Sequence, residues 1–305
     1  FTVLTEIGDS SSDKIRFRQE QAAIVDALLQ DRQIEADERF RQRVTAITSA
    51  PPPDDTTLPP SFQATLRPYQ LDGLRWLLHM QRNGLGACLA DDMGLGKTVQ
   101  VLALLESRRC RPDGQRPSLI VMPKSLLFNW QAEAARFAPQ LRLVVHAGSA
   151  RQCRPDAFVD VDLVLTTYGT LRNDAIKLAK VHFDYCILDE SQAIKNRDSA
   201  TARAARVIKA DHRLVMTGTP MENHLGELFS QLDFLNPGLI GAKLPGGTAV
   251  TSGNLSSDTL QRLRQGVRPF ILRRTKQQVA KDLPPKSEQI IWCELDEQQQ
   301  HEYDE

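Results

Sequence analysis

The stretch DDMGLGKT, Asp91 to Thr98, has the residue types that hold a phosphate chain. It lies between a strand-like run and a helix-like run, so the turn can point backbone N–H groups and the positive end of a helix dipole at an anion. Gly94 and Gly96 allow close approach and positive φ angles. Lys97 can reach the β- and γ-phosphates, and the Thr98 hydroxyl can bind magnesium. The pattern GxxxxGK[S/T] has a glycine where this sequence has Asp91, so an ordinary loop remains an alternative for this stretch alone.

Two adjacent carboxylates, Asp189 and Glu190, follow the apolar run at 185–188. A charge at the end of a buried strand costs stability unless a partner neutralises it, and a magnesium ion would do so. Asp189 could then orient the water shell of the ion, and Glu190 could polarise the attacking water as a general base. The alternative is a solvated pair that opens the next helix, where the helix dipole favours acidic side chains.

The sequence TGTP, Thr217 to Pro220, also comes directly after an apolar run. Ligands of open α/β sheets collect at the carboxyl ends of the strands, so Thr217 and Thr219 would lie on the ligand side. Taken alone, these four residues could form an ordinary turn.

Short apolar segments, which we interpret as strands, alternate with helical segments along the chain, and the motifs follow several of these strands. Because strands that are apolar almost throughout are buried on both faces, the pattern predicts an α/β domain with a mostly parallel sheet covered by helices on both faces. Residues 125–138 and 223–235 have apolar side chains at helical spacing, and we expect Ser125 and Asn223 to cap these helices. The predicted strands are 86–91, 118–122, 141–145, 161–167, 184–189 and 212–217.

The first 61 residues differ in character from this domain. Residues 15–44 have helical composition but become more charged than apolar, and residues 50–61 contain five prolines, which is typical of a linker. We therefore predict a mainly helical N-terminal appendage at 1–49, a linker at 50–61, a main α/β domain at 62–291 and the start of a further linker at 292–305.

The charge is balanced overall and uneven along the chain. Thirty-eight Lys plus Arg face thirty-eight Asp plus Glu, so the net charge gives no general indication of nucleic-acid binding. Residues 262–286 hold eight basic side chains against Asp282 alone, whereas residues 1–61 hold seven basic and eleven acidic ones. The basic stretch could face a nucleic-acid duplex, but we favour a solvated linker helix with DNA attraction as a secondary role.

The five cysteines are widely spaced and form no CxxC pair, which favours a reducing compartment over a disulfide framework or a zinc site. No apolar run reaches the roughly 18 residues of a membrane span, and the first residues lack the pattern of a signal peptide. We therefore expect a cytoplasmic protein, associated with the nucleoid if it is bacterial. The sequence begins at Phe1 without methionine and ends at HEYDE in a helix-like stretch, so we expect a fragment of a longer protein.

A series of motifs follows in order from about Leu66 to Ile291: LRPYQLDGLRWL, DDMGLGKT, LIVMPKSLLFNWQAE, VLTTYGTL, ILDESQAIKN, VMTGTPMENHLGELFSQLDFLNPG and FILRRTKQQVAKDLPPKSEQ. Together they resemble the Snf-type double-stranded DNA translocases of helicase superfamily two, which include the Swi/Snf chromatin remodellers. The residues of these motifs are most similar to those of bacterial members of the family. The family's own Walker A form also lacks a glycine where Asp91 stands, and the last motif is similar to the end of the family's first lobe.

The resemblance implies a RecA-like P-loop domain and gives roles to residues by position. The implied catalytic residues are Lys97, Asp189 and Glu190, and the implied metal ligands are Thr98 and Asp189. The implied nucleotide-binding residues are Arg67, Gln70, Asp92, Met93, Gly94, Leu95, Gly96, Lys97 and Thr98. The implied DNA contacts are Lys124, Ser125, Thr167, Tyr168, Lys195 and Asn196, which could otherwise be plain exposed polar residues. The implied coupling residues are Thr217, Gly218 and Thr219.

The sequence departs from the family pattern in a few places. DESQ has serine and glutamine where many members have alanine or glycine and then histidine, but the carboxylates are kept and Gln192 can still form hydrogen bonds. Asp92 stands where glutamate is common. The family also has a second RecA-like lobe whose arginines reach the γ-phosphate, and Arg273 and Arg274 are not those arginines by position.

The sequence therefore predicts the ATP-binding lobe of an ATP-dependent double-stranded DNA translocase, a DNA-dependent and helicase-like hydrolase that uses ATP and Mg²⁺. Its expected partners are double-stranded DNA, a second RecA-like lobe in cis and, as an option, a protein cargo. We expect low activity from this chain alone, because the second lobe is not part of it. One alternative is a nucleotide-gated DNA-binding module without hydrolysis of its own, and another is a P-loop ATPase unrelated to nucleic acid.

Overall fold

The computed structural model describes most of the chain. The described residues are 2–11, 14–30, 35–48, 56–111, 116–149, 151, 155–218, 225–240 and 257–279. The predicted cap Asn223, the coupling residue Thr219 and the predicted linker 292–305 lie outside these ranges.

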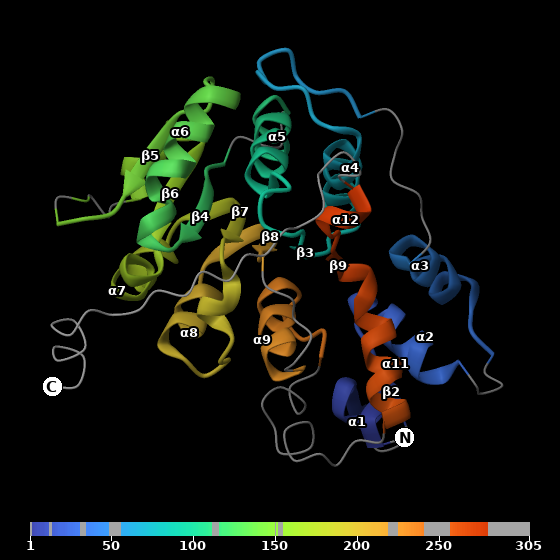
Figure 1. Ribbon diagram of the computed structural model, residues 1–305. Helices are drawn as coiled ribbons and strands as arrows, with labels where there is room; N and C mark the ends of the chain where they lie inside the picture. Colours follow the sequence, from blue (N-terminus) through green and yellow to red (C-terminus); the bar gives the residue numbers. More distant parts are fainter. Residues whose placement is uncertain are drawn as a thin grey trace, which may run out of the picture.

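Seven parallel strands form the main sheet in the order β5-β6-β4-β7-β8-β3-β9 (Figure 1). Their bounds are β3 Ala87–Leu89, β4 Ser118–Met122, β5 Leu143–His146, β6 Leu163–Thr167, β7 His182–Leu188, β8 Lys209–Met216 and β9 Ile271–Leu272. The first six confirm the predicted strands. The edge strand β9 was not predicted, because a two-residue strand is too short to show a periodic pattern.

The parallel arrangement follows from the apolar character of the strands. Every residue of β4 is buried, and β7 is buried from Phe183 to Leu188. A strand buried on both faces needs helices on both sides of the sheet, and Figure 1 shows them there. The helices on one side are α4 Pro68–Arg82, α5 Lys97–Arg109 and α6 Leu127–Phe137. Those on the other side are α7 Tyr168–Leu178, α8 Ala200–Arg206 and α9 Leu225–Leu235. The α/β fold class is thereby confirmed.

The start of α6 differs from the prediction. Ser125 lies inside the 3-10 turn η2 (Lys124–Leu126), and α6 has Leu126 as its N-cap with no side-chain cap. The Leu126 N–H donates to the Pro123 carbonyl at 3.0 Å, so the chain already turns before Ser125 can act as a cap. The predicted N-cap role of Ser125 is therefore wrong.

The N-terminal segment is mainly helical, as predicted, with a small antiparallel hairpin. Its elements are α1 Thr2–Ile7, β1 Asp9–Ser11, β2 Lys14–Arg16, η1 Gln19–Gln21, α2 Ala22–Leu29 and α3 Glu38–Thr48. Helix α2 packs closely against α11 (Ser257–Val267), since a Cβ atom on Gly266 would lie 2.6 Å from the Ile24 Cα. Ile24 is fully buried. Helix α2 thus shares the hydrophobic core, which the charged composition of this region did not indicate.

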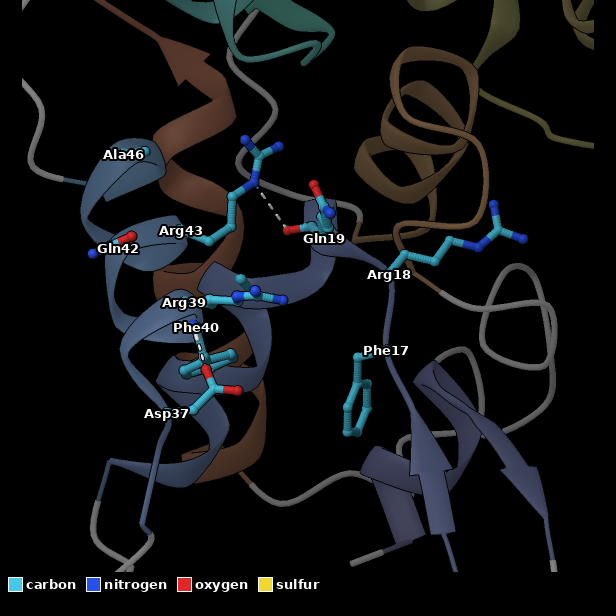
Figure 2. A pocket seen from close by; sticks show the side chains of 10 residues that line it. Phe17, Arg18, Gln19, Asp37, Arg39, Phe40, Gln42, Arg43 and Ala46 are labelled. Atoms are coloured by element: carbon cyan, nitrogen blue, oxygen red, sulfur yellow. Dashed lines mark hydrogen bonds between the residues drawn. The ribbon is translucent and has the colours of Figure 1, made fainter.

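The N-terminal segment contains a cavity of about 580 Å³ that is lined by side chains from α2, α3 and the residues before them. Figure 2 shows these side chains from close by. Two of its arginines are bound to backbone carbonyls of other segments: Arg43 donates to Asn83 at 3.0 Å, and Arg18 donates to Pro237 at 3.0 Å. None of the predicted site residues lines this cavity. Its arginines join the N-terminal segment to the rest of the domain.

The helices within the described ranges include none that is long and apolar enough to cross a membrane.

Candidate nucleotide and nucleic-acid site

The predicted phosphate loop lies between β3 and α5. Gly94 has φ 83° and Gly96 has φ 77°, so both have the positive φ angles that the sequence predicted and that favour glycine. Gly96 is the N-cap of α5, whose first-turn N–H groups have no carbonyl partner within the helix. A Cβ atom on Gly96 would lie 2.5 Å from the Gln70 side-chain nitrogen, which gives a second reason for glycine there. The turn has the geometry of an anion site.

Lys97 is the first residue of α5 and is partly buried. Its ammonium donates to the Asp91 carbonyl at 2.6 Å and to the Asp92 carbonyl at 3.3 Å. Burial lowers the pKa of Lys97, while the nearby carboxylates of Asp91, Glu190, Asp189 and Asp92 act to raise it. The charges of Asp189 and Glu190 act on Lys97, so the carboxylate pair lies within electrostatic range of the phosphate loop.

Helix α4 lies against the phosphate loop through two side chains. The Tyr69 hydroxyl and the Gln70 amide nitrogen each donate to the Leu95 carbonyl at 3.1 Å. The Gln70 amide oxygen accepts from the backbone N–H of Arg67 at 2.9 Å and so closes a capping box at the start of α4. Arg67 itself is exposed. The predicted nucleotide-binding residues Arg67 and Gln70 thus lie at a helix start that is hydrogen-bonded to the loop.

The carboxylate pair follows β7, as predicted. Asp189 is buried, and its Oδ2 accepts from the indole N–H of Trp130 at 2.8 Å. Burial raises the pKa of Asp189, and the charge of Glu190 also raises it, while the Trp130 bond and Lys97 lower it. Trp130 lies in the segment 125–138, whose apolar side chains have helical spacing, and it is buried in the core. Its contact with Asp189 was not predicted, because helical spacing identifies a buried face and not its partner.

Glu190 has an unusual conformation. Its φ is 49°, and it is the only described residue other than glycine with a positive φ. Such a backbone costs roughly 1–3 kcal/mol and tends to occur at functional sites. The Glu190 Oε2 and the Ser191 Oγ are buried without a hydrogen-bond partner. An acceptor oxygen that is buried and unsatisfied suits a carboxylate that must bind a water molecule or a cation.

Trp130→Phe is expected to raise the magnesium concentration needed for half-maximal ATPase activity by roughly tenfold, because a hydrogen bond to a charged group contributes about 1.5–3 kcal/mol. The phenyl ring keeps most of the packing and removes the donor to Asp189. The measurement is a magnesium titration of ATPase activity in the presence of duplex DNA. An unchanged magnesium requirement would mean that Trp130 serves the core alone.

Three strand ends bring the predicted DNA contacts to one edge of the sheet. Lys124 and Ser125 are exposed after β4, and Lys195 and Asn196 are exposed after β7. The Lys195 ammonium lies 4.0 Å from the Glu227 carboxylate. These four side chains are accessible from solvent at the carboxyl ends of neighbouring strands.

Thr167 and Tyr168 close β6 and open α7, and both have partners inside the protein. The Thr167 hydroxyl caps α7 by accepting from the Thr170 backbone N–H at 3.2 Å. The Tyr168 hydroxyl donates to the Asp189 carbonyl at 2.7 Å, and burial raises the pKa of Tyr168 well above its usual value. The half-buried Tyr168 therefore links the end of β6 to the carboxylate pair.

The predicted coupling residues lie at the end of β8, beside the phosphate loop. Thr217 is buried, and its backbone N–H donates to the Leu89 carbonyl of β3 at 3.2 Å. A Cβ atom on Gly218 would lie 2.8 Å from the Met93 side chain and 3.6 Å from the Lys97 ammonium. Glycine at position 218 therefore leaves the Met93 side chain in its place, whereas a larger residue would displace it.

The strand order determines where the predicted nucleotide-binding and DNA-binding segments lie along the carboxyl ends of the strands. Nucleotide motifs follow β3, β8 and β7, whereas the DNA candidates follow β6, β4 and β7, so β7 serves both halves. The donor set near Lys97 consists of the Thr98 hydroxyl and the two carboxylates, and the described residues include no cluster of three metal-binding side chains. Mg²⁺ usually takes one or two protein oxygens and completes its shell with water and substrate phosphates, so this donor set fits it.

Several known proteins are similar in sequence. YwqA of Bacillus subtilis (strain 168), named for an ATP-dependent helicase or translocase, is 39% identical over 281 residues, which cover 89% of this chain and 30% of YwqA. The TATA-binding protein-associated factor MOT1 of Saccharomyces cerevisiae is 38% identical over 273 residues, covering 81% of this chain and 15% of MOT1. The chain therefore spans less than a third of the length of these relatives.

Solved structures of a SWI2/SNF2 ATPase core are also similar to this chain. The Sulfolobus solfataricus SWI2/SNF2 ATPase core domain matches with a TM-score of 0.66 and 38% identity over 81% of this chain and 51% of that one. The same core in complex with dsDNA matches with a TM-score of 0.64 and 36% identity over 75% of this chain and 49% of that one. The model of the SNF2-related domain matches residues 69–305. Since that match covers most of the sequence, the chain belongs to the SNF2-related domain family.

Proposed function

We propose that this chain is the ATP-binding lobe of a translocase that couples hydrolysis of Mg-ATP to movement along double-stranded DNA. The observation that carries the proposal is the convergence of Gly94–Thr98, the Asp189–Glu190 pair and Gly218 around one lysine ammonium. These segments are far apart in the sequence, and each follows a different strand of the sheet. A phosphate loop, a lysine ammonium and two carboxylates in one region suit phosphoryl transfer to water.

In this proposal, the backbone N–H groups at the start of α5 bind the phosphate chain of ATP. Lys97 exchanges its bonds to the Asp91 and Asp92 carbonyls for bonds to the β- and γ-phosphates. Gln70 and Arg67 at the start of α4 face the adenine side, since Gln70 is already fixed to the loop at Leu95. Met93 is 57% exposed beside the loop and can cover a bound nucleotide.

Thr98 and Asp189 would hold Mg²⁺, which supplies positive charge to the phosphate oxygens when it is bound. Glu190 takes the proton of the attacking water, because its Oε2 is buried and has no other partner. Trp130 holds Asp189 in one orientation and leaves the second carboxylate oxygen facing Glu190, whose backbone N–H donates to it at 2.9 Å.

The proposed DNA contacts are the exposed side chains after β4 and β7 and the end of β6. The SWI2/SNF2 core of Sulfolobus solfataricus was solved with dsDNA, and its similarity supports duplex DNA as the partner here. Lysine, hydroxyl and amide groups at strand ends suit phosphate contacts, which carry little sequence preference. Tyr168 then gives a direct route from the DNA side to the catalytic side, since its hydroxyl binds the Asp189 carbonyl.

Full turnover in this proposal needs a second RecA-like lobe in cis. The relatives are more than three times as long as the matched region, which leaves room for such a lobe. We retain the proposed division into an appendage at 1–49, a linker at 50–61 and a lobe at 62–291. We also propose a cytoplasmic location, where duplex DNA is accessible in a bacterial cell.

Titration with duplex DNA tests the function. ATPase activity of the longer protein is expected to rise at least about tenfold with duplex and to depend on salt, because phosphate contacts release counterions. A scrambled duplex of the same length is the control and is expected to stimulate equally. Binding of duplex without turnover in that protein would instead support a nucleotide-gated module, and indifference to DNA would support a P-loop ATPase unrelated to nucleic acid.

A further inference from the structure

Asp91 stands where the usual phosphate loop has its first glycine, and it forms an ion pair with Arg274. The Asp91 side chain is fully buried, and the Arg274 side chain is 13% exposed. Arg274 Nε donates to Asp91 Oδ1 at 3.0 Å, and its Nη2 donates to Oδ2. The backbone N–H of Arg274 also donates to Oδ1 at 3.1 Å. One residue thus holds both oxygens of this carboxylate.

Arg274 also contacts two helices of the nucleotide site. Its Nη1 donates to the Tyr69 carbonyl in α4, and its guanidinium lies 5.4 Å from the centre of the Tyr69 ring. Its Nη2 donates to the Gln100 side chain in α5 at 2.9 Å. A Cβ atom on Gly73 would lie 2.8 Å from Nη2 and 1.9 Å from the Gln100 oxygen. Glycine at position 73 therefore leaves room for this network.

Backbone contacts join the same segment to the residues just before the phosphate loop. The Ala90 N–H donates to the Leu272 carbonyl at 2.7 Å, and the Asp92 N–H donates to the Arg274 carbonyl at 3.0 Å. The Lys276 N–H, at the start of α12 (Lys276–Val279), donates to the Asp92 carboxylate at 3.0 Å. Figure 1 shows α12 beside α4, next to the edge formed by β9. The chain after β9 is therefore bound to the base of the loop along its length.

We propose that Arg274 is a positioning residue for nucleotide binding: it fixes the phosphate loop, the Gln70-bearing helix α4 and the chain that leaves β9 relative to one another. The inference rests on the proposed function and deepens it. A planar guanidinium can donate to a carboxylate, a carbonyl and an amide at once, which a lysine ammonium cannot do with the same geometry. Removal of Arg274 leaves the buried Asp91 carboxylate without its ion-pair partner directly before the loop, with the 3.4 Å bond from the Gln100 amide nitrogen remaining.

The proposal has a reciprocal consequence. If the segment after β9 fixes the loop, then a nucleotide that orders the loop must also stabilise that segment, because coupling between two sites acts in both directions. An ion pair that served stability alone would change the unfolding temperature and leave nucleotide affinity unchanged. The two roles therefore separate in a binding measurement on folded protein.

The test compares Arg274→Ala, Arg274→Lys and Gln277→Ala with the unaltered full chain, titrated with a fluorescent ATP analogue and Mg²⁺. Circular dichroism first sets a temperature at which each variant is folded. Arg274→Ala is expected to weaken binding at least about tenfold, and Arg274→Lys less, since charge remains without the forked geometry. Gln277 is exposed on α12, and its replacement is expected to leave binding unchanged. A folded Arg274→Ala variant with unaltered affinity overturns the proposal.

Two further measurements keep the test decisive if Arg274→Ala does not fold. Asp91→Asn keeps the shape of the carboxylate and is expected to weaken binding in the same direction. Hydrogen exchange at 271–279 in the unaltered chain is expected to slow when the analogue binds. Exchange in α8 serves as the control and is expected to stay the same. Equal exchange at 271–279 with and without the analogue overturns the proposal.

Failure of the proposed function would look different from failure of this inference. If the unaltered chain does not bind the analogue, the nucleotide site itself is wrong and the inference falls with it. If the unaltered chain binds and the folded Arg274 and Asp91 variants bind equally well, only the role of Arg274 is wrong.

Discussion

Lys97→Ala is expected to lower ATP turnover at least about a hundredfold, which for most assays abolishes it, because one positioned donor to a developing charge contributes on that scale. Lys97 begins α5 and is the ammonium around which the loop, the carboxylate pair and Gly218 converge. Burial lowers the pKa of Lys97, and the surrounding carboxylates act in the opposite direction. The measurement is steady-state ATPase activity of the longer protein with saturating duplex DNA.

A matched control is Lys177→Ala, which removes an exposed lysine from α7 without touching the site. It is expected to retain normal turnover. Nucleotide binding by the Lys97 variant, followed with the same fluorescent analogue, shows whether the loss lies in binding or in the chemical step. Turnover by Lys97→Ala at the rate of the unaltered protein would remove the loop from the proposed site.

Glu190→Gln is expected to leave ATP bound and to slow hydrolysis by about 10²- to 10⁴-fold, the usual contribution of a general base. The amide keeps the size of the side chain but cannot accept the proton of the attacking water. The Glu190 backbone, at φ 49°, is maintained by its N–H bond to Asp189, which the substitution does not change. Single-turnover hydrolysis and equilibrium binding, measured on one preparation, separate the two effects.

Glu35→Gln provides the control for this substitution, because Glu35 is exposed in the N-terminal segment. It should be indistinguishable from the unaltered protein in both measurements. If Glu190→Gln hydrolysed ATP normally, the base would have to be another group, and the strained conformation of Glu190 would need a different explanation. Loss of binding together with hydrolysis would instead indicate that Glu190 holds the loop in place.

The positions of the chemical motifs could be predicted because each depends on local rules. Gly94 and Gly96 mark a turn with positive φ, and an apolar run before the turn marks a strand. The carboxylate pair at the end of β7 was also recognisable from a local rule, because a charge at the end of a buried strand costs stability unless a partner neutralises it. Six of the seven strands followed from composition alone, and only the two-residue β9 lacked a signal.

The contacts between distant segments could not be predicted from periodicity. Trp130 had the pattern of a core residue, and nothing in its surroundings indicated that its N–H would face Asp189, 59 residues away. The family resemblance implied a DNA contact for Tyr168, and the structure shows that its hydroxyl binds the Asp189 carbonyl. Such pairings depend on strand order, and a parallel sheet places strands side by side that are far apart in the sequence.

Asp91 separates what the sequence predicted from what depended on the tertiary structure. The sequence by itself determined that a glycine turn with positive φ angles follows a buried strand, because spacing and residue type set the local backbone. Only the tertiary structure decided what the aspartate does there, since its partner Arg274 lies just after β9, the last strand of the sheet. A buried carboxylate is stable only with a partner, and which partner reaches it depends on the strand order β8-β3-β9.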